Sequence, residues 1–267
     1  MFDIVFPMRR EFDGQFWQIT APFLKLALKY GIVGRWRHEP WADLNRSVAF
    51  DAYSVTRPAR GLPELGDFCS TLMMGSGVGR DHLPRFLRWL ALPETARELE
   101  VIRESFLRCE GLHDLPPADL ERLATFTDAA IQDKKRLKGI SIARIFKWLA
   151  AWAPAHVPMI DREVHYALTG YYPAEWLHES AVLLRRFQAI VATHVGPLRE
   201  VGRRLAAAWP EHFPAPLPPV RILDNVVWFD WLAVYTKDFC AYVVANDEGG
   251  RHEVTDLGRA FLREHGL

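Results

Sequence analysis

Apolar side chains recur at helical spacing along most of the chain, and this pattern predicts a mainly α-helical protein. The pattern is clearest on either side of one short break at Gly139. The positions that share a helical face are Leu120, Leu123, Ala124, Thr127 and Ile131 before the break and Ile142, Ile145, Phe146 and Leu149 after it. Two helices joined by a very short turn are therefore expected here.

Prolines, glycines and capping residues divide the rest of the pattern into further elements. Helices are predicted over residues 16–30, 63–74, 81–90, 94–109, 119–136, 141–153, 162–169, 174–195, 198–209, 220–235 and 255–264. Alternation allows a strand over residues 47–56, and residues 239–245 and 251–254 suggest a β hairpin. We expect minor β elements on a mainly α fold. We expect residues 1–267 to form a single unit, with residues 220–267 as a helical extension that can include the hairpin.

Composition is that of an ordinary globular protein. Hydrophobic residues make up 49% and charged residues 25% of the 267 residues, enough for one large domain or two closely packed lobes. The 33 basic residues equal the 33 acidic residues in number, so the formal net charge is zero. Affinity for a polyanion therefore requires local clusters of positive charge.

Several classes of protein are disfavoured by the sequence. The three cysteines, Cys69, Cys109 and Cys240, are widely separated, which argues against a disulfide framework and a compact metal site. Neither His38 nor His178 begins a zinc-protease motif. No apolar run approaches bilayer length, and no signal-peptide pattern is present. We expect a cytoplasmic protein that uses no metal or cofactor and contacts no membrane, and no protein partner is evident.

The break between the two helices has the residue types of a phosphate-binding turn. Gly139 can adopt the positive φ that a sharp reversal requires, and Ser141 suits the N-cap of the second helix. The first amides of that helix then face outward as an anion site. The basic residues around the turn are Lys134, Lys135, Arg136, Lys138, Arg144 and Lys147. A nucleic-acid backbone is the natural ligand, although an ordinary helix hairpin with a solvated basic face has about equal support.

A single carboxylate follows the second helix. Pro154 ends that helix, Pro158 holds the residue before it extended, and Asp161 opens a further short helix. A carboxylate held at a helix N-terminus can stabilise a cation that develops nearby. The simpler interpretation is that Asp161 only caps its helix, and the two roles are compatible.

Residues 137–167 resemble the helix-hairpin-helix core of the DNA glycosylase superfamily. The hairpin of that family is typically Leu-Pro-Gly-Val-Gly, and Leu137-Lys138-Gly139-Ile140-Ser141 takes its place. The family's catalytic Asp lies in a Val-Asp-Thr-His-Val type segment, where this chain has Asp161, and the two halves align without a gap. The resemblance implies a two-lobed helical fold with the hairpin and the catalytic segment at 119–170. The residues implied to hold the DNA strand are Lys134, Lys135, Lys138, Gly139, Ile140, Ser141 and Arg144.

Three positions depart from the family pattern and refine the implied activity. Lys138 replaces the hairpin proline and Ser141 replaces its second glycine, which affects the phosphate geometry. Ala143 stands where bifunctional members place a Schiff-base lysine. The resemblance therefore implies a monofunctional enzyme that hydrolyses the N-glycosidic bond with Asp161 and leaves an abasic site. Three cysteines cannot hold the four-cysteine iron–sulfur cluster of some relatives.

The target base and two other classes of function stay open. Superfamily members excise damaged bases, and phage-defence glycosylases excise glucosylated hydroxymethylcytosine. Base flipping requires stacking surfaces, for which Trp36, Trp41 and Tyr53 are candidates, although such aromatics are more often core residues. One alternative is a non-enzymatic helix-hairpin-helix DNA-binding protein in which Asp161 is only a cap. The other is a helical scaffold without a nucleic-acid role.

Overall fold

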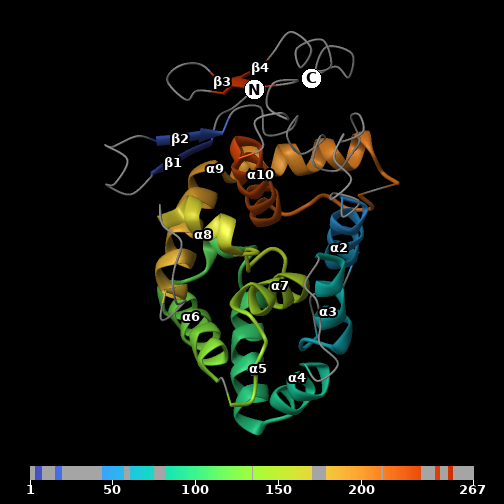
Figure 1. Cartoon of the computed structure of the whole chain (residues 1–267), viewed down its shortest axis with the longest axis vertical. Helices are drawn as coiled ribbons and strands as arrows, with labels where there is room; N and C mark the ends of the chain where they lie inside the picture. The colour runs from blue at the N-terminus through green and yellow to red at the C-terminus, as the bar shows by residue number, and fades with distance from the viewer. Residues whose placement is uncertain are drawn as a thin grey trace.

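The computed structural model describes residues 4–7, 16–19, 44–56, 61–74, 82–133, 135–169, 179–211, 213–235, 244–246 and 252–254. Within these ranges the protein is mainly α-helical, which confirms the fold class that the hydrophobic pattern predicts (Figure 1). The helices are α2 (Leu44–Thr56), α3 (Leu65–Ser70), α4 (His82–Leu90), α5 (Pro93–Leu107), α6 (Pro117–Gln132), α7 (Ile142–Trp152), α8 (Arg162–Thr169), α9 (Ser180–Ala208) and α10 (Pro219–Tyr235). Two 3-10 turns are η3 (Thr71–Met74) and η4 (Leu112–Asp114). No described helix is both long and apolar enough to cross a bilayer.

Two antiparallel strand pairs involve residues close to the ends of the chain. Strand β1 (Ile4–Pro7) pairs with β2 (Phe16–Ile19), and β3 (Val244–Asn246) pairs with β4 (His252–Val254). The second pair lies in the region where the sequence suggests a hairpin. The helix predicted from Phe16 is wrong over residues 16–19, because the backbone of these residues pairs with β1 instead. Phe16, Trp17 and Ile19 are residue types that favour strands. Residues 20–30 and the helix predicted over 255–264 lie outside the described residues.

Helix α2 corrects the strand allowed over residues 47–56. Phe50, Asp51 and Ser54 are all buried, which is the spacing of one helical face. Asp51 appears as an outward position in an alternating pattern, yet it is buried because Arg221, 170 residues away, binds its carboxylate. A contact at that separation leaves no trace in the local pattern.

Helix α7 lies in the middle of the described core. It contacts α2 and α3 on one side and α6 on the other (Figure 1). Phe146, Trp148 and Leu149 of α7 are completely buried. The core therefore fixes the helix that follows the predicted phosphate-binding turn.

Helix α9 runs along both α6 and α10. The sequence predicts two helices here with an interruption before Leu198. The structure has one element of 29 residues with a kink at His194, whose φ is −117° and ψ is 16°. Pro197 explains the kink, because proline lacks an amide hydrogen and its ring crowds the preceding helical turn.

Candidate functional site

The turn between α6 and α7 has the predicted backbone conformation. The amide of Ile140 donates to the carbonyl oxygen of Leu137 at 2.9 Å, which closes a four-residue turn. Gly139, the third residue of this turn, has a φ of +85°. A positive φ at the third position is what a type II turn requires, and glycine adopts it without steric cost. The conformational prediction for Gly139 is confirmed.

Ser141 caps α7, as the sequence predicts. Its hydroxyl oxygen accepts from the amide of Arg144 at 3.4 Å, and its backbone is extended. The first turn of α7 carries no acidic side chain. The partial positive charge of the helix N-terminus is therefore not neutralised by a carboxylate within that turn.

Helix α4 supports the turn from the side, a contact that the sequence analysis does not identify. A guanidinium nitrogen of Arg85 donates to the carbonyl oxygen of Lys138 at 3.3 Å. The imidazole of His82 lies against Gly139, so close that a Cβ atom at position 139 would be 2.5 Å from its Nε2. Glycine is therefore required here for space as well as for φ.

Basic side chains from α4 and the turn surround an open hollow of about 460 Å³. Its basic lining residues are Arg85, Arg88, Lys135, Arg136 and Lys138. We name this feature the basic hollow. Among the described residues, Asp133 supplies the only carboxylate within ion-pair distance of these five groups, 3.2 Å from Arg136. The basic hollow therefore keeps a net positive charge, although the protein as a whole has none.

Arg144 differs from the other residues predicted to hold a DNA strand. It is only 7% exposed, and one guanidinium nitrogen lies 3.1 Å from Nδ1 of His82. Burial lowers the pKa of the Arg144 guanidinium from its ordinary value. Arg144 therefore contacts His82 of α4 and is much less accessible to a DNA strand than Lys135 and Lys138, which are exposed.

The remaining predicted residues have mixed outcomes. Ile140 is half-buried and packs on the core. The hydroxyl of Tyr53, a candidate pocket residue, donates to buried Asp67 at 3.1 Å and so joins α2 to α3. These contacts are those of a structural residue. Lys134, Trp36 and Trp41 lie outside the described residues.

Asp161 stands at the N-terminus of α8. Its Oδ1 accepts from the amide of Val164 at 3.0 Å, which is the N-cap bond that the sequence predicts. The side chain is half-buried, so it is not enclosed in the core. A helix N-terminus favours negative charge at this position.

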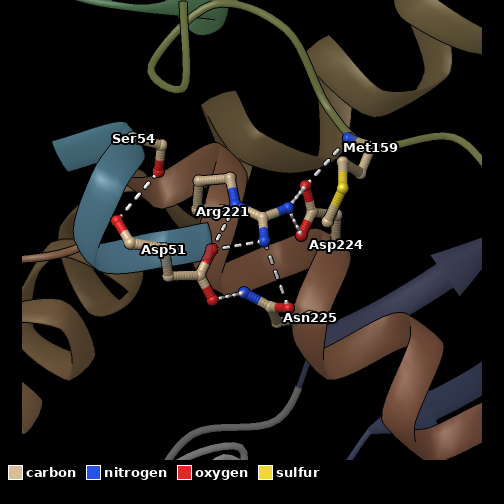
Figure 2. Close-up of polar contacts among 6 residues, drawn as sticks. All are labelled: Asp51, Ser54, Met159, Arg221, Asp224 and Asn225. Atoms are coloured by element: carbon tan, nitrogen blue, oxygen red, sulfur yellow. Dashed lines mark hydrogen bonds and ion pairs between the residues drawn. The ribbon is translucent and has the colours of Figure 1, made fainter. Parts of the chain in front are cut away.

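A buried ion network lies behind the segment that leads to Asp161 (Figure 2). Oδ2 of Asp224 accepts from the amide of Met159 at 2.9 Å, two residues before Asp161. Asp224 also binds the guanidinium of Arg221, which is 0% exposed. Nε of the same guanidinium donates to Asp51 at 2.9 Å.

This network joins distant parts of the chain. Asp51 comes from α2, while Arg221 and Asp224 come from α10. A buried guanidinium is tolerated because two carboxylates face it and satisfy its donors. These residues are not among those predicted from the sequence, although an arginine between the apolar residues Val220 and Ile222 is a signal of a buried partner.

The start of α8 is also held by a buried histidine. His165, one helical turn after Asp161, is completely buried. Its Nε2 lies 2.6 Å from a carboxylate oxygen of Glu179, and its Nδ1 lies 3.2 Å from the hydroxyl of Thr169. These contacts join α8 to the residue that precedes α9.

One cluster has the residue types of a metal site. The ligand atoms of Glu110, His113 and Asp114 lie within 4.8 Å of one another. A guanidinium nitrogen of Arg199 lies 3.3 Å from Nε2 of His113 and also pairs with Glu110. Because a cationic side chain already occupies this position, the geometry is that of an ion-pair cluster.

Comparisons with known protein families, with curated proteins and with solved structures find no match for this chain.

Proposed function

We propose that this protein is a monofunctional DNA glycosylase. It binds DNA through the turn before α7 and hydrolyses the N-glycosidic bond of a flipped, modified base with Asp161. The observation that carries the proposal is the tight turn at Gly139, capped by Ser141, with exposed Lys135 and Lys138 beside it. The sequence resemblance adds Asp161 at the matching distance.

The turn suits a phosphodiester for two physical reasons. The N-terminus of α7 presents a partial positive charge, and its first turn has no acidic side chain. Lys135 and Lys138 are exposed, and neither has a carboxylate partner among the described residues. A DNA phosphate supplies the missing negative charge and releases counterions when it binds.

Asp161 suits the chemistry of base release. Departure of the base breaks the bond between C1′ and the base nitrogen, and positive charge develops on the sugar. A fixed carboxylate stabilises that charge electrostatically. Water then adds to C1′, and the proton that it loses passes to the carboxylate, which acts as a general base. The base leaves with the electron pair of the broken bond and takes up this proton, so Asp161 returns to its ionised form. The products are the free base and an abasic site.

The proposal requires the turn and Asp161 to act on one nucleotide. Helix α7 separates them by 11 residues, which corresponds to a length of ~16 Å. The segment that follows the helix begins with a turn, in which the amides of His156 and Val157 donate to the carbonyl oxygen of Ala153 at 3.0 and 2.9 Å, and this turn reverses the chain after α7. Ala143 offers no amine for a covalent imine at the position that bifunctional enzymes use. Hydrolysis is therefore the reaction that fits these residues.

The target base is a modified one, either a damaged base or a hypermodified phage base such as glucosylated hydroxymethylcytosine.

A second function is favoured by one specific observation. Asp161 accepts the N-cap bond from the amide of Val164, and this structural role requires no catalysis. A non-enzymatic DNA-binding protein with the same turn is therefore the alternative.

One assay separates these functions. The purified protein is incubated with duplexes that carry different damaged bases and with phage genomic DNAs, and abasic sites are revealed by alkaline cleavage. The glycosylase produces abasic sites, and Asp161→Asn abolishes them while DNA binding persists. Asparagine is also a favoured N-cap residue, so this variant keeps the fold. Asp119→Asn, in the first turn of α6, is the matched control and stays active.

Two other results point away from the enzyme. DNA binding without abasic sites on any substrate favours the non-enzymatic protein. Absence of salt-dependent DNA affinity removes both nucleic-acid functions and leaves the helical scaffold.

A further inference from the structure

We infer that helix α4 forms part of the nucleic-acid surface. Arg85 and Arg88 of this helix bind a backbone phosphate in the basic hollow, beside the phosphate that the turn holds. This inference rests on the proposed binding of DNA. It adds two residues that lie about 50 positions before the turn in the sequence (138 − 88 = 50).

One face of α4 packs in the core, and the neighbouring face carries two arginines. Phe86 and Trp89, three residues apart, are buried, and Phe86 stacks on Phe68 with ring centroids 4.0 Å apart. The ring of Phe86 also meets Trp148 of α7 edge-on at 4.8 Å. Arg85 and Arg88 have the same three-residue spacing on the neighbouring face and line the basic hollow. The core therefore anchors α4 to the helix that begins at the turn.

The arginine-bearing helix is also attached directly to the turn. Arg85 donates to the carbonyl oxygen of Lys138, and His82 lies against Gly139. The cations of the helix and of the turn are therefore arranged before any ligand binds. Such preorganisation reduces the entropy that a ligand must overcome when it binds.

The charges of the basic hollow favour an anion with several phosphate groups. Within the described part of the chain, Arg88, Lys135 and Lys138 have no carboxylate partner. Like charges that line one hollow repel one another, and a bound anion reduces this repulsion. Arginine binds phosphate oxygens through two parallel N–H donors, a geometry that lysine lacks.

The lining of the basic hollow fits the backbone of DNA better than its bases. Apart from the cations, the hollow is lined by Trp89 and Leu92. Trp89 is only 6% exposed, so it offers little surface for base stacking. The lining residues that the structure describes include no side-chain acceptor for the edge of a base. Contacts to phosphates position a protein without reading sequence. The volume of about 460 Å³ lies in the usual range of ligand sites.

The test is the salt dependence of DNA binding by the full-length chain, measured by fluorescence anisotropy on one duplex between 50 and 200 mM NaCl. Each phosphate contact contributes about 0.9 to the slope of log affinity against log salt. We expect Arg88→Ala to reduce the slope by about this amount, so that its affinity falls about 3.5-fold less than that of the wild type across the range. Arg122→Ala is the matched control because Arg122 is exposed and pairs with Glu98 at 3.1 Å.

The controls separate the inference from the proposed function. Arg122→Ala removes the same charge and should leave the slope unchanged, whereas Lys138→Ala should reduce it. If Lys138→Ala reduces the slope and Arg88→Ala does not, α4 is not part of the nucleic-acid surface, and DNA binding by the turn stands. If Arg88→Ala and Arg122→Ala have equal effects, the change reflects overall charge and the inference is wrong. If the wild type has no salt-dependent affinity, the inference and the proposed function are both wrong.

Discussion

Two clusters of charged side chains in this protein differ in how their cations are paired with carboxylates. In the network around Arg221, one completely buried guanidinium faces the carboxylates of Asp51 and Asp224. In the basic hollow, five basic side chains face one described carboxylate, that of Asp133. The first cluster is compensated within the fold, and the second is not.

The difference shows where charge serves the fold and where it is available to a ligand. A buried cation without partners would be expensive, so the carboxylates of the first cluster stabilise the folded state. The exposed cations of the basic hollow contribute little to folding and repel one another. Zero net charge thus coexists with a local group of basic side chains that face one described carboxylate.

The largest expected effect comes from breaking the compensated cluster. Arg221→Met removes the guanidinium that faces the buried carboxylates of Asp51 and Asp224 and should lower the free energy of unfolding by about 3–5 kcal/mol. Urea denaturation measures this change. Adding Asp51→Asn and Asp224→Asn removes the two carboxylate charges that Arg221 neutralises and should recover part of the loss. A cost below about 1 kcal/mol for Arg221→Met, the range of an exposed ion pair, would contradict the assigned role of the network.

A third titratable group, the imidazole of His156, is held neutral by burial. His156 is 8% exposed, stacks on Phe106 and lies 3.2 Å from the carbonyl oxygen of Cys109. Burial lowers the pKa of His156 from 6.5 to about 4. Between these values the unfolded chain binds a proton that the folded chain does not, so stability falls as the pH decreases from 6.5 towards 4. The contribution lost is about 3 kcal/mol.

The pH dependence of urea unfolding checks this prediction through a difference between two proteins. His156→Gln lacks the titrating ring, so its stability should change less than that of the wild type across the same window. Parallel curves for the two proteins would show that His156 is not held neutral by burial.

The turn that organises the uncompensated cluster should be sensitive to one added methyl group. Gly139→Ala places a side chain at a φ of +85° and a Cβ atom 2.5 Å from Nε2 of His82. We expect a loss of stability of about 1–2 kcal/mol and weaker DNA binding. Gly196→Ala is the control, because nothing lies within 4 Å of its added Cβ and alanine is the better helix former. Equal stability of the two variants would argue against the strained turn.

The smallest effect on stability should come from the basic hollow itself. Arg88 is exposed and has no carboxylate partner among the described residues, so Arg88→Ala should change the free energy of unfolding by less than about 0.5 kcal/mol. Thermal and urea unfolding test this value. A loss as large as that of Arg221→Met would erase the distinction between the two clusters.

Local signals made much of the fold and the turn predictable. Helix α8 has the predicted bounds, and α7 differs from its prediction by one residue at each end. The bounds of α7 are predictable because Ser141 and Pro154 flank its run of apolar spacing. The conformation of Gly139 follows from the same short segment. These features depend on neighbours along the chain, which is the information that a pattern of residues contains.

Contacts between distant segments were not predictable in the same way. The alternation in residues 47–56 allowed a strand that the structure does not have. Asp51 is a buried position of a helix, because its carboxylate binds Arg221, which lies 170 residues away. The contact of α4 with the turn depends on how Phe86 packs against α7, which no local pattern reveals. Arg144 appears in the sequence as one more surface cation, and only packing against His82 shows that it is buried.

The central claim is that Asp161 promotes release of a modified base from DNA, and release of the base itself tests it most directly. The wild type and Asp161→Asn are incubated with damaged duplexes and with phage DNA that contains glucosylated hydroxymethylcytosine, and the free base is quantified by mass spectrometry. We predict free base from the wild type on at least one of these DNAs and about 100-fold less from Asp161→Asn, with DNA binding retained by both. Equal release by the two proteins, or no free base from any DNA that the wild type binds, would contradict the claim.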